Sequence, residues 1–353
     1  MENTRSRIIN KISLINFRKF LELDLNIKKN TVIFYGNNAT GKTTILESIY
    51  MAGMTKSHKT NNDNEVVSFN KPYAAVNIKG IKNNQIVISK YGKTTKINGI
   101  EIKKLSDYIG NLYVIMFSPE DLSLVKGSPI ERRKFLDMEI GQVNKSYLIE
   151  MNRYRKILKE RQELLKSMDL DDDYLPLEII TRELMESASK IFQYRTDFIN
   201  EINAIAQKIH YSISNENLSI EYVKKEISIE DYLLKLKSDV ISKITAYGPH
   251  RDDLFFYING NKANLCSQGQ QRTICLSLKI ALYEYIKRHT KQEPIILLDD
   301  VLSELDDIRQ KKLIGIIKNT QAFITTTNID VIRNMLSDCQ IFMLKENEIK
   351  ELN

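Results

Sequence analysis

The segment that most constrains this chain is glycine-rich and lies near its start. Residues 36–43 read GNNATGKT, which matches the pattern GxxxxGK[ST]. The apolar run Thr31–Tyr35 precedes this glycine-rich loop, and a helical pattern from Lys42 to about Met54 follows it. Glycines let the backbone N–H groups of such a loop face phosphates, and the start of the helix adds a favourable dipole. The order of strand, loop and helix therefore predicts a nucleotide-binding α/β fold.

The glycine-rich loop supplies the candidate cofactor-binding residues. We expect Lys42 to reach the β- and γ-phosphates and Thr43 to place its hydroxyl on Mg²⁺. The predicted cofactors are ATP and Mg²⁺. The binding set comprises the loop and the next residue: Gly36, Asn37, Asn38, Ala39, Thr40, Gly41, Lys42, Thr43 and Thr44.

A second segment, the acidic strand at residues 295–300, reads IILLDD and supplies carboxylates. We expect Asp299 to hold Mg²⁺ directly or through water, and Asp300 to orient or deprotonate the attacking water. A buried strand that ends in aspartate is common by itself. Together with the glycine-rich loop it predicts Lys42, Asp299 and Asp300 as catalytic residues, and Thr43 and Asp299 as metal ligands.

Composition narrows the class of protein. The chain has 353 residues, of which 42% are hydrophobic and 27% charged, and this excludes wholesale disorder. No run of about 18 apolar residues is present, so no membrane-spanning helix is expected. Three cysteines without a CxxC pair predict a reduced, cytoplasmic protein that has no disulfide framework and no zinc site. The net charge of +7 permits a polyanionic partner without requiring one.

The chain changes character twice along its length. Residues 74–103 read as a lysine-rich β meander whose simplest interpretation is a solvated sheet face. Two long helices are predicted next, over about 131–165 and 177–211, as an antiparallel helical hairpin. Arg161 and Arg195 interrupt their apolar seams, so a helical bundle is nearly as well supported as a coiled coil.

The α/β pattern returns after about residue 241, which predicts a split head. Residues 1–125 would form its N-terminal half, 126–240 an inserted α-helical arm, and 241–353 its C-terminal half. The predicted fold class is α/β, a P-loop ATPase head that is split in sequence.

A third motif identifies the kind of ATPase. The signature segment, residues 266–272, reads CSQGQQR and opens a helix upstream of the acidic strand. Ser267 is a natural N-cap, and the N–H groups near Gly269 can contact phosphate. The segment resembles the LSGGQ signature of ABC-type ATPases, and residues 303–306 resemble their D-loop. The matching positions are Ser267, Gln268, Gly269, Gln270 and Gln271 in the signature, and Ser303 and Asp306 in the D-loop.

This resemblance implies a head-to-tail homodimer, because in such ATPases the signature of one subunit closes over ATP on the other subunit's P-loop. A long insertion separates Lys42 from Ser267, as in SMC-like ATPases. The short arm is typical of the RecF family of bacterial recombination mediators. Residues 15–20, 117–122, 124–129, 132–137 and 247–253 also resemble that family.

Membership of the RecF family would imply a weak, DNA-stimulated ATPase that acts as a switch. ATP would drive dimerisation on duplex DNA next to single-stranded gaps. With RecR and RecO, the protein would promote RecA loading in recombinational repair, replication restart and SOS induction. The alternatives are another SMC-like chromosome-maintenance ATPase and, with less support, a transporter ATPase subunit.

Some positions have both a functional and a structural interpretation. By analogy with SMC-like heads, Arg18 would contact the adenosine or α-phosphate, and a surface arginine is an equal alternative. Charged helix faces are usually only solvated, yet a basic stripe suits DNA phosphates. The candidate DNA contacts are Arg132, Arg133, Lys134, Arg153, Arg155 and Lys156, with Lys159 and Arg161 on the same arm.

Other residues depart from the ABC pattern or could be taken for reactive groups. Asp300 stands where transporters carry glutamate, which implies slow hydrolysis. The switch histidine is replaced within residues 325–328, TTTN. His250 is expected to be structural, His58 to lie in an exposed loop, and Cys266 to be a packed residue, although a helix N-terminus can activate a thiol.

Overall fold

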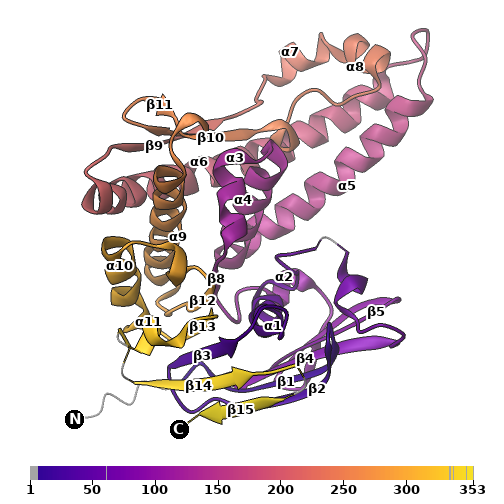
Figure 1. Ribbon diagram of the computed structural model, residues 1–353. Coiled ribbons are helices and arrows are strands. Elements are labelled where there is room, and N and C mark those ends of the chain that lie inside the picture. Colours follow the sequence, from indigo (N-terminus) through magenta and orange to yellow (C-terminus); the bar gives the residue numbers. More distant parts are fainter. Residues whose placement is uncertain (1–6, 61, 334, 337, 347, 353) are drawn as a thin grey trace. The chain divides into compact units, whose positions relative to one another are not determined.

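The chain divides into two compact units in a computed structural model that describes residues 7–60, 62–333, 335–336, 338–346 and 348–352 (Figure 1). The first unit comprises Met1–Asp121 and Cys275–Asn353, and the second comprises Leu122–Ile274. The second unit therefore extends beyond residue 240, where the sequence placed the end of the arm. The difference arises because a small β-sheet and the signature segment pack with the helices.

One sheet of the first unit is antiparallel, with strand order β2-β1-β4-β5-β6-β7. It contains the predicted lysine-rich meander, since β4 to β7 pair in sequence order. Alternate residues of β5 are buried, so one face of this strand packs against the core. The strands are β1 (Ile9–Phe17), β2 (Phe20–Asn26), β4 (Tyr73–Gly80), β5 (Asn84–Ser89), β6 (Gly92–Ile97) and β7 (Ile100–Ile102).

The other sheet of the first unit has the order β15-β14-β3-β13-β12-β8 and is parallel except for β15. All residues of β12 and β13 are buried, which explains their nearly continuous apolar sequences. The strands are β3 (Thr31–Gly36), β8 (Val114–Phe117), β12 (Ile295–Asp299), β13 (Ala322–Thr326), β14 (Cys339–Leu344) and β15 (Ile349–Leu352). Because parallel strands end at one edge, the glycine-rich loop and the acidic strand converge there.

Helix α1 (Lys42–Met54) contacts strands of both sheets and is buried on nearly every side. Its apolar character all round fits this position between two layers (Figure 1). The first unit also holds α2 (Leu105–Tyr108), α10 (Asp307–Ile317), α11 (Ile329–Arg333), most of α9 (Gln268–Thr290), and the short 3₁₀ helices η1 (Asp63–Val66), η2 (Pro119–Leu122) and η5 (Leu302–Glu304). No described helix has the length and apolar character needed to cross a membrane.

The second unit combines helices with a small antiparallel sheet of order β11-β10-β9. Its helices are α3 (Ser123–Lys126), α4 (Pro129–Val143), α5 (Lys145–Ser167), α6 (Leu175–Ser214), α7 (Ile229–Leu233), α8 (Leu236–Ser242), η3 (Pro249–Arg251) and η4 (Ala263–Leu265). Its strands are β9 (Leu218–Val223), β10 (Asp253–Ile258) and β11 (Asn261–Lys262). The sequence did not predict β9, α7 or α8.

The prediction of one helix over 131–165 is wrong, because α4 ends at Val143 and α5 begins at Lys145. Asn144 separates them with an extended backbone, and its Oδ1 accepts a hydrogen bond from the Tyr147 N–H at 3.1 Å. That hydrogen bond caps the start of α5. Apolar spacing could not reveal the break, because both helices continue the same burial pattern.

Helices α5 and α6 pack along each other (Figure 1). Two arginines are buried in their seams. Arg161 is fully buried and forms an ion pair with Asp239 at 2.7 Å. Arg195 is also buried and pairs with Asp137 at 2.8 Å and Asp252 at 2.9 Å. Charged networks therefore replace the apolar seam of a coiled coil, which favours the helical-bundle alternative.

Candidate nucleotide-binding site

The glycine-rich loop connects the end of β3 to the start of α1, as the sequence predicted. A Cβ atom at Gly36 would lie 2.3 Å from the carbonyl oxygen of Leu344, so no side chain fits there. Gly41 has a φ of +100°, and a Cβ there would lie 2.7 Å from the Phe20 ring. Both positions therefore require glycine, for close approach and for backbone conformation respectively.

The Lys42 ammonium is folded onto the loop. It donates hydrogen bonds of 2.7 Å to the carbonyl oxygens of both Gly36 and Asn37. Burial lowers the pKa of Lys42, while the carboxylates of Asp300 and Asp299 oppose that change. A phosphate held by the loop would compete with the two carbonyls for these donors, so Lys42 is placed to neutralise phosphate charge.

Asp299 brings the loop and the acidic strand together. Its Oδ1 accepts hydrogen bonds from the Thr43 hydroxyl at 2.7 Å and from the Thr325 hydroxyl at 2.8 Å. Thr43 and Asp299 are 256 residues apart in sequence, and the order β3-β13-β12 brings them together. Carboxylate and hydroxyl oxygens are ligands that Mg²⁺ accepts, so these residues fit the predicted metal.

Asp300 has an unusual backbone conformation, with a φ of +55°. Its N–H donates to the Thr325 hydroxyl at 2.9 Å, and its carbonyl accepts from the Ser303 hydroxyl at 2.9 Å. Burial raises the pKa of Asp300, although the nearby Lys42 ammonium opposes that change. A carboxylate with a raised pKa is better suited to accept a proton from water.

Thr325 is a residue that the sequence did not assign to the site. The sequence indicated only that residues 325–328 replace the switch histidine. The buried Thr325 hydroxyl bridges the Asp299 carboxylate and the Asp300 main chain, whereas the neighbouring Thr326 hydroxyl bonds to Asn328. The signal that could have found it is a hydroxyl at the end of a buried strand adjacent to the acidic strand.

Arg18 forms a bidentate ion pair with Glu47 of α1, at 2.7 and 3.0 Å. Burial alone would raise the pKa of Glu47, but hydrogen bonds from Arg18 and Ser57 outweigh it and lower the pKa. Arg18 also donates to the Glu65 carbonyl at 2.9 Å. Arg18 is thus a partly exposed arginine with structural partners, as its alternative interpretation expected, and its contact with adenosine or the α-phosphate stays a prediction.

His58 is not in an exposed loop, contrary to the expectation from sequence. Its ring packs edge-on against Tyr50, with centroids 5.5 Å apart. Both ring nitrogens are buried without a hydrogen-bond partner among the described residues. Burial lowers the pKa of His58, so the ring is preferentially neutral.

The signature segment in the second unit begins α9 with a capping box. The Ser267 hydroxyl accepts from the Gln270 N–H at 3.3 Å, and the Gln270 side chain accepts from the Ser267 N–H at 2.9 Å. A Cβ at Gly269 would meet only the Ser267 hydroxyl, at 3.9 Å, so the surface beside Gly269 is open. The amide of Gln271 donates to the Ala263 carbonyl at 3.1 Å and fixes η4 against the helix.

Cys266, next to the signature, is not an activated thiol. Burial and the carboxylate of Glu216 raise its pKa.

In the D-loop, the Ser303 hydroxyl donates a hydrogen bond to the Asp300 carbonyl. The Asp306 carboxylate caps α10 by accepting a hydrogen bond from the Arg309 N–H at 3.0 Å. Asp306 thus has a structural partner within its own unit.

The six candidate DNA contacts are not a uniform basic stripe. Arg132 is buried and pairs with Asp253 at 2.6 Å, and Arg133 donates to the Asp252 carbonyl at 2.8 Å. Arg155 is half-exposed and pairs with Asp137 at 2.7 Å. The DNA-contact prediction is wrong for Arg132 and Arg161, because both side chains are buried. Each arginine instead neutralises a carboxylate that the protein interior could not hold without an opposite charge.

Two of the arm candidates remain more accessible. The Arg153 guanidinium lies 3.7 Å from both Glu150 and Glu186, and its side chain is 42% exposed. The Lys156 side chain is 80% exposed and lies 3.9 Å from Glu160. Both have loose ion pairs that phosphate could displace.

His250 has a structural position. Its Nε2 lies 3.1 Å from the Thr245 carbonyl, which can only accept, so Nδ1 accepts from the Tyr154 hydroxyl at 2.6 Å. Burial lowers the pKa of His250 to about 4, which keeps the ring neutral. Among the described residues, no group of His, Cys, Asp and Glu side chains forms a metal cluster.

Comparison with known proteins gives consistent matches over nearly the whole chain. The model of the RecF/RecN/SMC N terminal domain matches residues 8–350. The DNA replication and repair protein RecF of Bacillus pumilus is 41% identical over 97% of this chain and 99% of its own length. Its counterpart from Streptococcus agalactiae serotype V is 42% identical over 97% of each chain.

Solved structures give the same similarity. A structure described as the recombination mediator protein RecF with ATP in the RecFOR pathway has a TM-score of 0.91, 30% identity and full coverage of both chains. The Smc head domain from Pyrococcus furiosus, bound to the C-terminal domain of ScpA, has a TM-score of 0.53, 17% identity and coverage of 98% and 95%. The second likeness supports the fold alone.

Proposed function

Because the chain belongs to the RecF family of SMC-like ATPases, we propose that it is an ATP-dependent DNA-binding clamp of recombinational repair. ATP and Mg²⁺ bind at the glycine-rich loop and drive homodimerisation. The dimer binds duplex DNA next to single-stranded gaps in the cytoplasm. With RecR and RecO it promotes RecA loading, replication restart and SOS induction.

The observation that carries this proposal is the convergence of Thr43, Lys42 and Asp299 at the carboxyl edge of the parallel sheet. Lys42 neutralises phosphate charge, while Thr43 and Asp299 hold Mg²⁺. The metal supplies charge stabilisation at the phosphates. Asp300 accepts a proton from the attacking water, for which burial has raised its pKa.

The signature segment completes the site of a second subunit. Ser267 and Gly269 present a helix start and an open surface, which suit a phosphate. Ser303 links the D-loop to Asp300 through hydrogen bonds, so a contact across the dimer would reach the catalytic carboxylate. Weak, DNA-stimulated hydrolysis would then release the clamp.

The inserted helical arm and the extent of the resemblance separate this function from that of a transporter subunit. The described chain contains a helical arm in the second unit, and the resemblance over nearly its full length is to RecF proteins. A chromosome-maintenance role on the same SMC-like fold is the remaining alternative. Preference for gapped over uninterrupted duplex DNA distinguishes the two.

The test compares the protein with its Lys42→Ala variant by light scattering and by binding to gapped duplex DNA. ATP should convert the protein to dimers and increase its DNA affinity about tenfold or more, which is at least 1.4 kcal/mol. Lys42→Ala should lose both responses, because the phosphate charge is no longer neutralised. Lys42→Arg should retain ATP binding and lose hydrolysis.

The control is Lys104→Ala, which removes an exposed lysine from the first unit. It should respond to ATP as the unmodified protein does. A protein that stays monomeric with ATP and Mg²⁺, and whose DNA affinity does not change, would rule out the clamp.

A further inference from the structure

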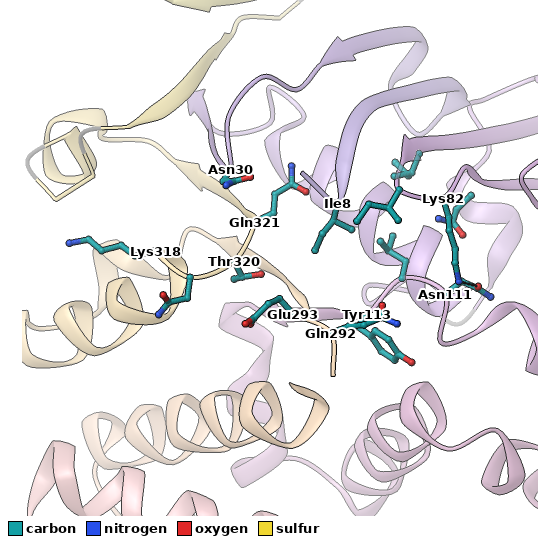
Figure 2. Close-up of a pocket in the computed structure, with 15 residues that line it drawn as sticks. Ile8, Asn30, Lys82, Asn111, Tyr113, Gln292, Glu293, Lys318, Thr320 and Gln321 are labelled. Atoms are coloured by element: carbon teal, nitrogen blue, oxygen red, sulfur yellow. Dashed lines mark hydrogen bonds between the residues drawn. The ribbon is translucent and has the colours of Figure 1, made fainter. Parts of the chain in front are cut away.

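A cavity of about 450 Å³ lies in the first unit, at the amino ends of the parallel strands. Its lining includes Asn30 before β3, Tyr113 before β8, and Gln321 before β13 (Figure 2). The nucleotide-binding residues lie at the carboxyl ends of the same strands. The cavity is therefore a separate site, and its volume is within the range of ligand pockets.

Part of the cavity wall is aliphatic. Ile8, Ile78 and Leu112 line it from three different segments, and the 64%-exposed Ile81 lies in the turn after β4. A set of branched aliphatic side chains favours an aliphatic group of similar size. Tyr113 is the sole aromatic residue among the described lining residues, and base recognition in nucleic acids depends on stacking platforms.

A buried amide in the lining has an unpaired oxygen. Asn84 is 2% exposed, and its Oδ1 makes no hydrogen bond to any described residue. Leaving such a group unpaired is costly, so a ligand that donates to it would gain affinity. A carboxamide offers both an acceptor and donors, which complement the C=O and N–H of a peptide main chain.

The same cavity already contains a side chain that recognises main chain in this way. The Gln321 side chain accepts from the Ile9 N–H at 2.7 Å and donates to the Ile9 carbonyl at 2.8 Å. Gln321 is thereby satisfied, whereas Asn84 is not. If the buried Asn84 amide turned toward the cavity, it would offer an external segment the chemistry that Gln321 provides for an internal one.

The charge of the lining selects an acidic ligand. Lys82 and Lys318 lie on opposite sides of the cavity (Figure 2). The Lys82 amine donates to the neutral Asn111 side chain at 2.7 Å, so its charge is not compensated there. The carboxylate of Glu293 pairs with Lys287 at 2.9 Å, outside the lining. Positive charge is therefore available at both ends of the cavity.

We propose that this cavity binds an extended acidic peptide segment of a partner protein. An aliphatic side chain of the peptide packs against Ile8, Ile78 and Leu112. Its main chain hydrogen-bonds to the Asn84 amide, and its flanking carboxylates face Lys82 and Lys318. This is β-strand-like recognition, in which main chain gives affinity and one pocket gives specificity.

The test uses the full chain and a fluorescein-labelled hexapeptide with two central leucines and two glutamates on each side. Fluorescence polarisation should show saturable binding below about 1 mM. A peptide with lysines in place of the glutamates should not bind. Lys82→Glu together with Lys318→Glu should weaken the acidic peptide at least tenfold, while binding of a fluorescent ATP analogue stays unchanged.

Asn84→Leu separates an effect on peptide binding from an effect on folding, because it should raise the stability of the protein and lower its affinity for the peptide. Removing an unpaired buried amide oxygen should raise the melting temperature, since leucine has the same branched shape and needs no hydrogen-bond partner. The same change should weaken the acidic peptide at least fivefold. A purely structural asparagine would not combine higher stability with weaker binding.

Three results would overturn the proposal. The first is that the acidic peptide does not bind saturably. The second is that the double lysine variant binds it as tightly as the unmodified protein does. The third is that single-stranded oligothymidylate at equal concentration displaces the peptide fully. The last result would assign the cavity to nucleic acid. Since ATP binding is measured in the same variants, failure here is distinguishable from failure of the nucleotide site.

Discussion

At the scale of single residues, the nucleotide site depends on one hydroxyl outside both recognised motifs. Thr325 holds the Asp299 carboxylate and the Asp300 N–H at the same time. In the proposed function the Thr43 hydroxyl would bind Mg²⁺, and Thr325 would remain to orient Asp299. It also holds the left-handed backbone at Asp300, which a non-glycine residue adopts only with support.

Thr325→Val should lower the rate of ATP hydrolysis about 10–100-fold, the usual effect of removing a residue that orients a metal ligand. The Mg²⁺ concentration for half-maximal activity should rise, and the thermal stabilisation that Mg²⁺ adds to ATP should fall. Binding of ATP without Mg²⁺ should not change. Thr325→Ser should restore all three readouts, because it keeps the hydroxyl.

Thr320→Val is the matched control for this change. Thr320 is buried just before the same strand, and its hydroxyl bonds to the Pro294 carbonyl at 2.6 Å, far from the acidic residues. It should affect stability without changing the Mg²⁺ dependence. Equal Mg²⁺ dependence in Thr325→Val and the unmodified protein would remove Thr325 from the site.

At the scale of elements, buried charge decides how the arm packs. Arg161 of α5 reaches Asp239 of α8, Thr181 of α6 and Thr245, at 2.7, 2.9 and 2.7 Å respectively. The Tyr232 hydroxyl of α7 also donates to Asp239 at 2.7 Å. One arginine thereby joins four segments, and such a network specifies a single arrangement.

Asp239→Ala should destabilise the protein by about 3–5 kcal/mol, because it leaves the Arg161 charge buried and unpaired. Urea unfolding measured by circular dichroism gives the difference. Glu160→Ala, which removes the loose pair with the exposed Lys156, should cost less than about 1 kcal/mol. Similar values for both variants would mean that the buried network does not stabilise the arm.

At the scale of the whole molecule, basic residues can contact DNA only where they are not held in strong ion pairs with carboxylates. Arg132 and Arg161 are consumed by internal ion pairs, whereas Arg153 and Lys156 have loose partners. The proposed clamp therefore binds DNA through few arm residues. Binding to phosphates releases counterions, so it should weaken steeply with salt.

Arg153→Gln together with Lys156→Gln should reduce the slope of log affinity against log salt by about 2, because each variant leaves one DNA phosphate without its cation. The measurement is a salt titration of ATP-dependent binding to gapped duplex DNA. ATP hydrolysis without DNA should be unaffected. An unchanged slope would place the DNA elsewhere on the protein.

The sequence alone predicted the elements whose signals are local. The glycine-rich loop, the acidic strand and the meander follow from spacing, turn residues and alternation, which the backbone must obey wherever it lies. The sequence could not reveal the break at Asn144, because a side-chain cap resembles any polar residue in a helix. It also missed β9, a short strand that exists only through its pairing with β10.

Thus the sequence by itself determined that this chain has a P-loop, a partner carboxylate and the motifs of an SMC-like ATPase. Only the tertiary structure decided that Thr325 joins the site, that Arg132 and Arg161 are internal, and that Asn84 is buried without a partner for its Oδ1 among the described residues. The physical reason is that motifs depend on neighbours along the chain. Burial and charge compensation depend on residues that lie far apart in sequence and meet only when the sheets and helices pack.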